Sequence, residues 1–317
     1  MILRHIRYLL AVAEHRNFTR AADALHVSQP ALSQFIRQLE AELGGQLFDR
    51  SGRVVRLTDF GSAYVEHVRR ALVDLEAGRR ALHDVRDLSR GQLRLAFTPT
   101  FTEYLVAPLV RHFNALYPGI ALDLKEDSLE AIEKALTDDQ IDVAIGFADV
   151  RSAEIEVEPL FSERLLLVVG GAHPLVTKPH TVTPQELAAL PLALLTSSFS
   201  ARAYVDSYFQ SNGIRPRIAL QANSISVVLK IVRGGEIATV LPSAMQQEHA
   251  DLTYVPLDPA FPGRTVALLK RKGAYSSAAS STFSAILREM LSSGALSRLR
   301  TMDDKPAKAR SKRVRSR

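Results

Sequence analysis

A short polar stretch at residues 28–37 carries side chains that suit the recognition of base pairs. Gln29, Ser33 and Gln34 combine hydrogen-bond donors with acceptors, and Arg37 carries a planar cationic fork. Glutamine pairs bidentately with adenine, serine serves several bases, and arginine holds phosphate or guanine. On the outer face of a helix these groups would contact a DNA groove, although the same residues also suit a solvated surface.

Two short helices would have to position this polar face. The first is predicted over residues 18–25, where apolar side chains recur with helical spacing after the capping residue Asn17. The second begins after Ser28, with Pro30 in its first turn, where a missing N–H costs little. Its inward stripe consists of Leu32, Ile36, Leu39 and Leu43. By spacing alone, the pair fits a DNA-binding helix-turn-helix and an ordinary helical hairpin equally well.

The flanking segments favour the DNA-binding interpretation. Residues 2–15 predict a preceding amphipathic helix, and residues 47–58 (LFDRSGRVVRLT) predict a hairpin wing around the turn Ser51-Gly52. Three arginines cluster on this hairpin, namely Arg50, Arg53 and Arg56. Arginines beside a recognition helix suit phosphate contacts or a narrow minor groove.

A long helix is predicted directly after the wing, over about residues 59–86. Its seam positions alternate in steps of four and three, and they are Tyr64, Val68, Ala71, Leu75, Gly78, Leu82 and Val85. Such a heptad seam favours pairing between the helices of two chains, although it would also suit packing on the chain's own domain. Because paired half-sites need paired recognition helices, we expect a dimerisation helix here.

Residues 1 to about 86 resemble the N-terminal half of LysR-type transcriptional regulators. The resemblance is carried by FTRAADALHVSQPALSQFIRQLEAELGGQLFDRSGRVVRLTDFG. It implies double-stranded promoter DNA and RNA polymerase as partners, and a homodimer or homotetramer. It also implies base contacts by Gln29, Pro30 and Ser33, and contacts to the DNA backbone or groove by Ser28, Gln34, Arg37, Arg50 and Arg53.

Phe35 departs from this family pattern, which has mostly polar residues at that position. An aromatic ring there either packs on the first helix or shifts the contacts at one base step. The departure leaves the operator sequence open.

The remainder of the chain alternates predicted strands with predicted helices. The first set has strands at 92–97, 120–126 and 141–147 and helices at 101–117 and 128–138. The second set has strands at 191–195, 217–222 and 237–242 and helices near 200–212 and 224–233. The segment 164–170 continues the first sheet or crosses out of it, and a strand at 264–272 and a helix near 277–293 close the chain. Each set predicts parallel strands with helical crossovers, so we expect two lobes and a ligand cleft.

Two helix starts are expected to line that cleft. Thr98, Thr100 and Phe101 follow the first strand, and Asn223-Ser224 follow a strand of the second set. Helix N-termini present unpaired N–H groups that suit small anions, whereas each start by itself also fits an ordinary helix cap.

This half of the chain, over most of residues 91–293, resembles the inducer-binding domain of LysR-type regulators, which has a periplasmic-binding-protein-like fold. The segments TPTFTEYLVAPL, QANSISVVLKIVRGG and TVALLKRK resemble more narrowly the regulators of cyanate operons. The resemblance implies a cyanate-like anion as inducer and an activator of cyanate detoxification genes, with aromatic carboxylates as the main rival inducers. It implies inducer contacts by Thr98, Thr100, Phe101, Ser198, Asn223 and Ser224.

The net charge of +6 is concentrated at the C-terminus. Residues 298–317 hold nine lysines and arginines against two acidic residues, whereas residues 1–90 hold 14 arginines against 11 acidic residues. The tail is therefore expected to be disordered and either solubilising or attracted to phosphate. Cysteine is absent, which excludes a thiol redox switch in this chain.

The expected fold is α/β with an all-α, winged N-terminal module. We expect a winged helix-turn-helix at 1–58, a linker helix at 59–87, a two-lobed inducer-binding domain at 91–296 and a basic tail at 297–317. Lobe 1 is expected at about 91–163 and 268–296, and lobe 2 at about 164–267.

The motifs of common enzymes are absent from the sequence. No G-x-S-x-G elbow, phosphate-binding loop or H-E-x-x-H motif occurs, and the nine histidines lack metal-ligand spacing. We therefore expect no enzymatic activity, no cofactor and no metal. The absence of a signal peptide and of a membrane-length apolar segment indicates a cytoplasmic protein. A small-solute-binding protein without a regulatory role is the alternative of another class.

Overall fold

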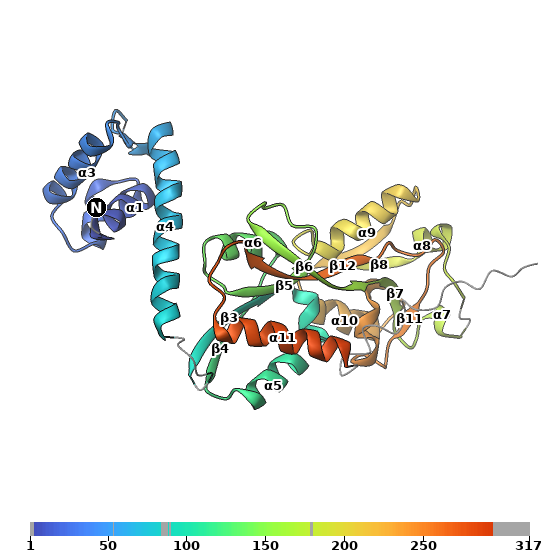
Figure 1. Ribbon diagram of the computed structural model, residues 1–317. Coiled ribbons are helices and arrows are strands. Elements are labelled where there is room, and N and C mark those ends of the chain that lie inside the picture. Colours follow the sequence, from blue (N-terminus) through green and yellow to red (C-terminus); the bar gives the residue numbers. More distant parts are fainter. Residues whose placement is uncertain (1–2, 53, 84–87, 89, 178–179, 294–317) are drawn as a thin grey trace, which may run out of the picture. The chain divides into compact units, whose positions relative to one another are not determined.

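The computed structural model describes residues 3–52, 54–83, 88, 90–177 and 180–293. The chain forms two compact units, Met1–His83 and Asp84–Arg317, and each is described by itself (Figure 1). The expected tail at 297–317, together with Arg53 and Val85, lies outside the described residues. Among those described, no helix combines the length and the apolar character needed to cross a membrane.

The N-terminal unit is a helical module with a small two-stranded sheet. Its elements are α1 (Leu3–His15), α2 (Phe18–Ala24), α3 (Gln29–Leu43), β1 (Phe48–Asp49), β2 (Arg56–Leu57) and α4 (Asp59–His83). The two strands pair antiparallel, as a hairpin wing requires. One apolar core joins all of the helices, with Leu9, Leu32 and Ile36 completely buried.

Local capping explains where the short helices begin and end. The side chain of Asn17 accepts a hydrogen bond from the backbone N–H of Arg20 at 3.0 Å, and the Ser28 hydroxyl accepts one from Ala31 at 3.4 Å. The third helix ends at Gly44, whose φ of 72° is a left-handed conformation that glycine adopts without steric cost.

The long helix α4 divides its heptad seam between two environments. Val68 is buried in the core of the unit, whereas Leu75 is 51% exposed. Ala71 and Gly78 are exposed as well. The later seam positions therefore present a surface that this single chain leaves uncovered, while the side chain of Leu82 lies outside the described part.

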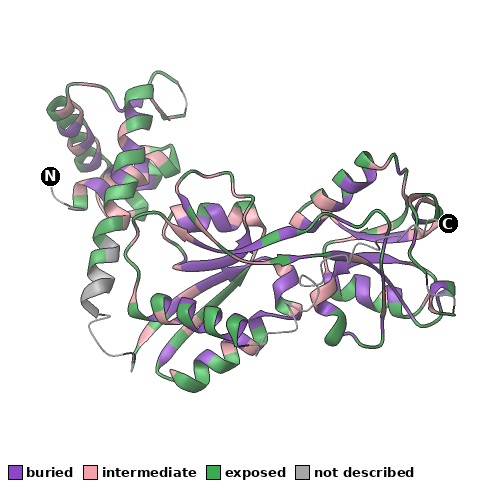
Figure 2. Cartoon of the chain, turned by 45° about the vertical axis from the view of Figure 1, so that its right-hand side comes forward, coloured by how far each residue is buried: buried purple, intermediate pink, exposed green. Residues whose placement is uncertain are grey.

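The first lobe of the C-terminal unit is built on a five-stranded sheet of order β4-β3-β5-β12-β6. Its elements are β3 (Gly91–Phe97), the 3-10 helix η1 (Pro99–Glu103), α5 (Val106–Leu116), β4 (Ile120–Glu126), α6 (Leu129–Thr137), β5 (Val143–Phe147), β6 (Ile155–Glu163), β12 (Arg264–Arg271) and α11 (Ala278–Ser292). Strand β3 is parallel to β4 and β5, and β12 is antiparallel to β5 and β6. Helices α5 and α11 pack on one face and α6 on the other, so the central strands β3, β5 and β12 are buried on both sides, whereas the edge strands β4 and β6 are partly exposed (Figure 2).

The second lobe repeats this arrangement. Its elements are β7 (Leu165–Val169), α7 (Pro174–Thr177), α8 (Pro184–Ala189), β8 (Pro191–Leu195), α9 (Ser200–Ser211), β9 (Arg217–Ala222), α10 (Ile225–Arg233), β10 (Thr239–Pro242), η2 (Ser243–Gln247) and β11 (Thr253–Val255). Strand β8 is parallel to β9 and reaches β10 through a bridge between Leu192 and Ala238, while β7 lies antiparallel between β10 and β11. The two lobes thus share one pattern of parallel and antiparallel neighbours.

Several elements differ from those predicted. The helix expected at 101–117 is split into η1 and α5, and β6 was not predicted at all. Strand β12 begins at Arg264 and belongs entirely to the first sheet, so the lobe boundary expected at 268 falls inside a strand. Segment 164–170 leaves the first sheet and forms β7 of the second.

Candidate DNA-binding face and ligand cavity

The outer face of α3 carries the polar groups expected to contact DNA. Gln29, Pro30, Gln34 and Arg37 are exposed, and Ser33 is half-buried. Three apolar residues of the same helix, Leu32, Ile36 and Leu39, face the core. The hydroxyl of Ser28 is engaged as a helix cap. The described part of the chain therefore places all of these candidates on or at the start of one helix.

The ring of Phe35 packs on α1. Its centroid lies 3.7 Å from the ring of His5 and 5.3 Å from that of Tyr8, both in edge-on geometry. Of the two expectations for this departure from the family pattern, the structure shows the packing on the first helix. Burial and the charge of Arg4 lower the pKa of His5, which favours the neutral imidazole.

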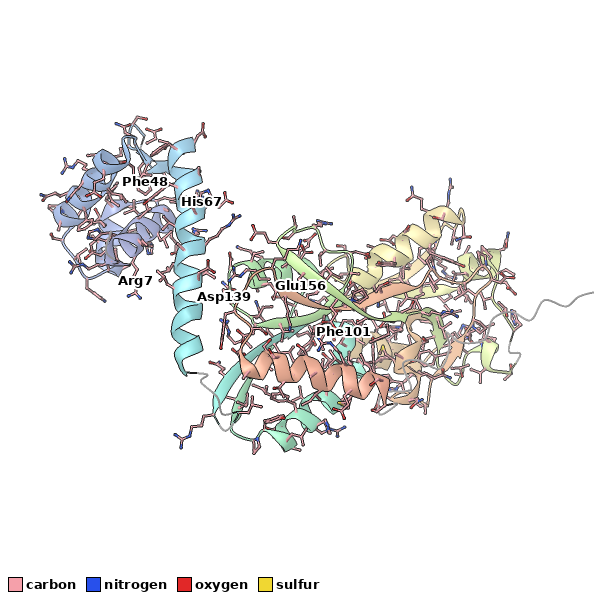
Figure 3. The ribbon with its side chains drawn as sticks, in the orientation of Figure 1. Arg7, Phe48, His67, Phe101, Asp139 and Glu156 are labelled. Atoms are coloured by element: carbon pink, nitrogen blue, oxygen red, sulfur yellow. The ribbon has the colours of Figure 1, made fainter. Side chains whose placement is uncertain are left out.

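Arg50 is held by the protein at the base of the wing. Its guanidinium lies 2.7 Å from the carboxylate of Glu40 on α3 and 5.0 Å from the centroid of the Phe18 ring. The other oxygen of Glu40 accepts hydrogen bonds from the backbone N–H groups of Leu47 and Phe48 at 2.9 and 3.2 Å. Arg50 thus fixes the strand β1 against α3. Phe48 lies in the N-terminal unit beside α4 (Figure 3) and is buried.

The start of α4 is fixed to the same segment. The Thr58 hydroxyl donates to the carbonyl of Gln46 at 2.6 Å and accepts from the N–H of Gly61 at 2.9 Å. A Cβ atom on Gly61 would lie 2.0 Å from the carbonyl oxygen of Leu47. Because no side chain fits in that gap, only glycine allows α4 to approach this backbone so closely.

A cavity of about 360 Å³ lies between the two lobes of the C-terminal unit. Lobe 1 contributes the start of α6 and the end of β5, and lobe 2 contributes the loop before α9 and its first turns. The lining comprises Ser128, Leu129, Glu130, Glu133, Phe147, Asp149, Arg151, Ser197, Ser198, Phe199, Ser200, Ala203 and Tyr204. A mixed aromatic and polar lining of this size is typical of a small-molecule site.

The structure does not bring all six expected inducer contacts together. Ser198 lines the cavity, whereas Thr98, Thr100, Phe101, Asn223 and Ser224 do not. Asn223 is exposed, and Ser224 caps α10 through the N–H of Val227 at 3.5 Å.

Thr98, Thr100 and Phe101 are buried. The two threonines are only 2% and 3% exposed, and neither hydroxyl has a hydrogen-bond partner among the described residues. Phe101 is completely buried (Figure 3), and its ring centroid lies 5.2 Å from that of Phe147, which does line the cavity. An unsatisfied buried hydroxyl is costly, and Thr98 does not cap η1 through its side chain either.

Sequence reasoning missed most of the cavity lining. Phe147 ends a predicted parallel strand, and the carboxyl end of such a strand is a known position for ligand groups. Asp149 follows two residues later, so the end of this predicted strand indicated both Phe147 and Asp149 as candidates. Tyr204 and Phe199 come from the other lobe, and no local pattern places them opposite Phe147.

A buried polar cluster lies where the lobes join. Arg264, the first residue of β12, and Glu163, the last of β6, are directly paired across the two strands. Their side chains are 0% and 1% exposed and form an ion pair, and the hydroxyl of Tyr104 donates to the same carboxylate. Burial and the neighbouring charge of Glu163 raise the pKa of Tyr104 well above its usual value. The guanidinium also lies 4.0 Å from the Phe147 ring and 5.6 Å from that of Tyr204.

Both units match known protein families. Residues 3–62 match the family described as bacterial regulatory helix-turn-helix protein, lysR family, and residues 86–292 match the LysR substrate binding domain. The chain is 30% identical over 261 residues to the HTH-type transcriptional regulator AlsR of Bacillus subtilis, spanning 81% of this chain and 86% of that relative.

Solved structures of full-length proteins show the same architecture. A full-length OxyR from Pseudomonas aeruginosa is 25% identical, with a TM-score of 0.65 and coverage of 96% of this chain and 99% of that one. Full-length CbnR in complex with its target DNA is also 25% identical, with a TM-score of 0.58 and coverage of 91% and 99%.

Proposed function

Because the chain belongs to the LysR family, and is therefore a DNA-binding transcriptional regulator with a ligand-binding domain, we propose that the outer face of α3 recognises its operator. In this proposal Gln29, Pro30 and Ser33 contact base edges, while Ser28, Gln34 and Arg37 hold the DNA backbone. The observation that supports it is the exposure of this polar face beside a core-facing apolar stripe on one short helix. Major-groove recognition needs such a helix.

The wing is proposed as a second DNA contact. Arg53 remains the candidate at its tip on sequence grounds alone. Arg50 contacts Glu40 and Phe18, and its side chain is 34% exposed, so we assign it chiefly to holding the wing in place, with the exposed part of the guanidinium left for phosphate.

Replacing Gln29 by alanine is expected to reduce discrimination among operator variants by about 1–3 kcal/mol, because a bidentate base contact is lost. Arg37→Ala is expected to weaken binding to all sequences alike and to lower the slope of log affinity against log salt by about one. Gel-shift titrations at two salt concentrations measure both effects. Gln38→Ala, at an exposed position of the same helix engaged with Glu42, is the control. Unchanged operator discrimination in Gln29→Ala would count against base contact by this residue.

We propose further that α4 pairs two chains through the exposed part of its seam. Heptad pairing covers apolar side chains of this kind, and Leu75 is 51% exposed in the single chain. A homodimer presents two recognition helices to two half-sites, and association of two dimers gives the proposed homotetramer.

Leu75→Lys is expected to shift the protein towards monomer and to weaken binding to a paired operator by at least about tenfold, since a charge would be placed in an apolar seam. Sedimentation velocity and gel shifts measure these effects. Leu75→Met conserves the volume and should leave both unchanged. A Leu75→Lys protein that sediments like the parent would remove this seam from the dimer.

The cavity between the lobes is the proposed ligand site. A ligand that prefers one lobe arrangement shifts the equilibrium between arrangements, whereas one that binds both equally shifts nothing. Such a shift would change how the dimers associate and how the DNA is bent, with contact to RNA polymerase as the outcome at an activated promoter.

Access to chromosomal DNA requires a cytoplasmic location for this role. Residues 3–62 match a DNA-binding family. This match disfavours the alternative of a small-solute-binding protein without a regulatory role.

Two chemical classes of ligand are considered for this cavity. The sequence resemblance implies a cyanate-like anion or, as its rival, an aromatic carboxylate. The cavity offers little support for cyanate, because this three-atom anion would fill only a small part of about 360 Å³. This chain contains no cysteine, so its ligand response involves no thiol oxidation.

A further inference from the structure

We propose that the cavity between the lobes binds an organic amine, with the ammonium group at Asp149 and an apolar body against Phe147, Phe199 and Tyr204. The inference rests on the proposed ligand role of this cavity and adds the chemical class of the ligand. Its basis is the balance of charge in the lining and the nature of the walls.

The lining contains three carboxylates and one guanidinium. Glu130 and Arg151 neutralise each other through an ion pair of 2.6 Å. Glu133 is buried, and one of its oxygens accepts hydrogen bonds from the backbone N–H groups of Arg151 and Ser152 at 2.9 and 2.8 Å. Asp149 is exposed and makes no hydrogen bond or ion pair with any residue that the structure describes. One carboxylate is therefore open to a ligand.

The net charge of the lining opposes an anion. Two carboxylates remain after the Glu130–Arg151 pair is set aside. The helices α6 and α9 both begin at the cavity, and each N-terminus adds a partial positive charge of about half a unit. The sum stays negative, so a cationic ligand is attracted and a carboxylate or cyanate is repelled. Phe199 precedes α9 and makes no side-chain cap hydrogen bond. The backbone N–H groups at the start of α9 can therefore donate to a neutral acceptor group on the same ligand.

The walls suit an apolar body next to a cation. Phe147 and Phe199 are buried beneath the surface, while Tyr204 is half-buried. Aromatic faces attract cations, and the protein itself places the Arg264 guanidinium 4.0 Å from the Phe147 ring. That face of Phe147 is therefore occupied and the residue is only 1% exposed, so Phe199 and Tyr204 supply most of the apolar contact. The volume of about 360 Å³ falls in the range of small-molecule sites.

The test is a thermal-shift titration of the full chain with matched probes at constant ionic strength. Benzylamine and n-hexylamine carry the ammonium, benzoate and hexanoate carry a carboxylate on the same bodies, and sodium cyanate is the small anion. We expect at least one amine to raise the Tm in a saturable manner, and none of the three anions to do so. Asp149→Asn should weaken the apparent affinity for that amine by about tenfold, as expected when a charge-assisted hydrogen bond is lost. Glu248→Gln, an exposed carboxylate outside the lining, should leave it unchanged.

Three results would overturn the proposal: no response to either amine, stabilisation by an anion equal to that by the amine, or an amine response that Asp149→Asn leaves intact. Gel shifts on the same preparation separate this failure from that of the proposed function. Specific DNA binding without an amine response would reject this ligand class alone. Absence of specific DNA binding by the parent chain would instead count against the proposed recognition of an operator by α3.

Discussion

Replacing Arg264 by methionine is expected to lower the free energy of unfolding of the C-terminal unit by about 3–5 kcal/mol. The substitution leaves the carboxylate of Glu163, which is 1% exposed, without its cation. A buried charge without a partner is among the most destabilising changes that a single substitution makes. Tyr104 still donates one hydrogen bond to this carboxylate, but a neutral donor replaces only part of the lost stabilisation.

A matched surface pair isolates the effect of burial. Arg288 and Glu158 form a two-point ion pair whose side chains are 49% and 38% exposed. Arg288→Met is expected to cost only about 0–1 kcal/mol, because water screens exposed charges. Urea unfolding followed by circular dichroism measures both variants. The double variant Arg264→Met/Glu163→Gln should recover part of the loss, since no uncompensated charge remains. Equal costs at the two sites would show that the buried pair contributes no more than a surface one.

The position of this pair connects the ligand cavity to the joint between the lobes. Glu163 ends β6, with only Arg164 between it and the start of β7 in the second lobe, and Arg264 begins β12 as the chain returns to the first lobe. The guanidinium contacts the rings of Phe147 and Tyr204, one from each lobe, and both line the cavity. A ligand that moves either ring therefore acts on a group anchored in both crossing strands. This physical contact between the site and the joint is a route by which a bound ligand can bias the lobe arrangement.

The N-terminal unit could be predicted because its determinants are local. Asn17, Ser28 and Gly44 cap helices within a few residues of where they stand, and the structure has these caps. The packing of Phe35 on α1 was one of two expectations, and only the tertiary structure distinguishes them. The ion pair through which Arg50 holds the wing was not predicted either, because its partner Glu40 lies ten residues away on another element.

The C-terminal unit was predictable in outline only. Alternating strands and helices indicated two α/β lobes, since their hydrophobic periods are local. The strand β6 was missed because its residues vary between buried and exposed without a regular period. Glu163 and Arg264 are about a hundred residues apart, and the cavity lining comes from both lobes. Contacts of this kind depend on register and crossover geometry, which single-sequence patterns do not contain.

Gly61→Ala is expected to destabilise the N-terminal unit by about 3 kcal/mol, at the upper end of the cost of overpacking. The new methyl group would lie 2.0 Å from the carbonyl oxygen of Leu47, which is backbone and cannot rotate away. Either α4 or the segment leading into the wing must move. That movement separates the wing from the core that holds α3, so specific DNA binding should fall together with stability.

The same helix supplies the control. In the single chain, no atom beyond the backbone of its own helix lies within 4 Å of the place where a Cβ on Gly78 would stand, so Gly78→Ala should instead stabilise α4 of each chain by about 0.5–1 kcal/mol through its better helix propensity. Urea unfolding and gel shifts on both variants give the comparison, with the parent chain as reference. Opposite signs at the two glycines are the expected outcome, because Gly61 is limited by contact with backbone of its own chain, whereas within the chain Gly78 is limited only by helix propensity. A Gly61→Ala protein as stable as the parent would mean that α4 and the wing root separate at little cost, and the wing would then not be rigidly positioned for DNA.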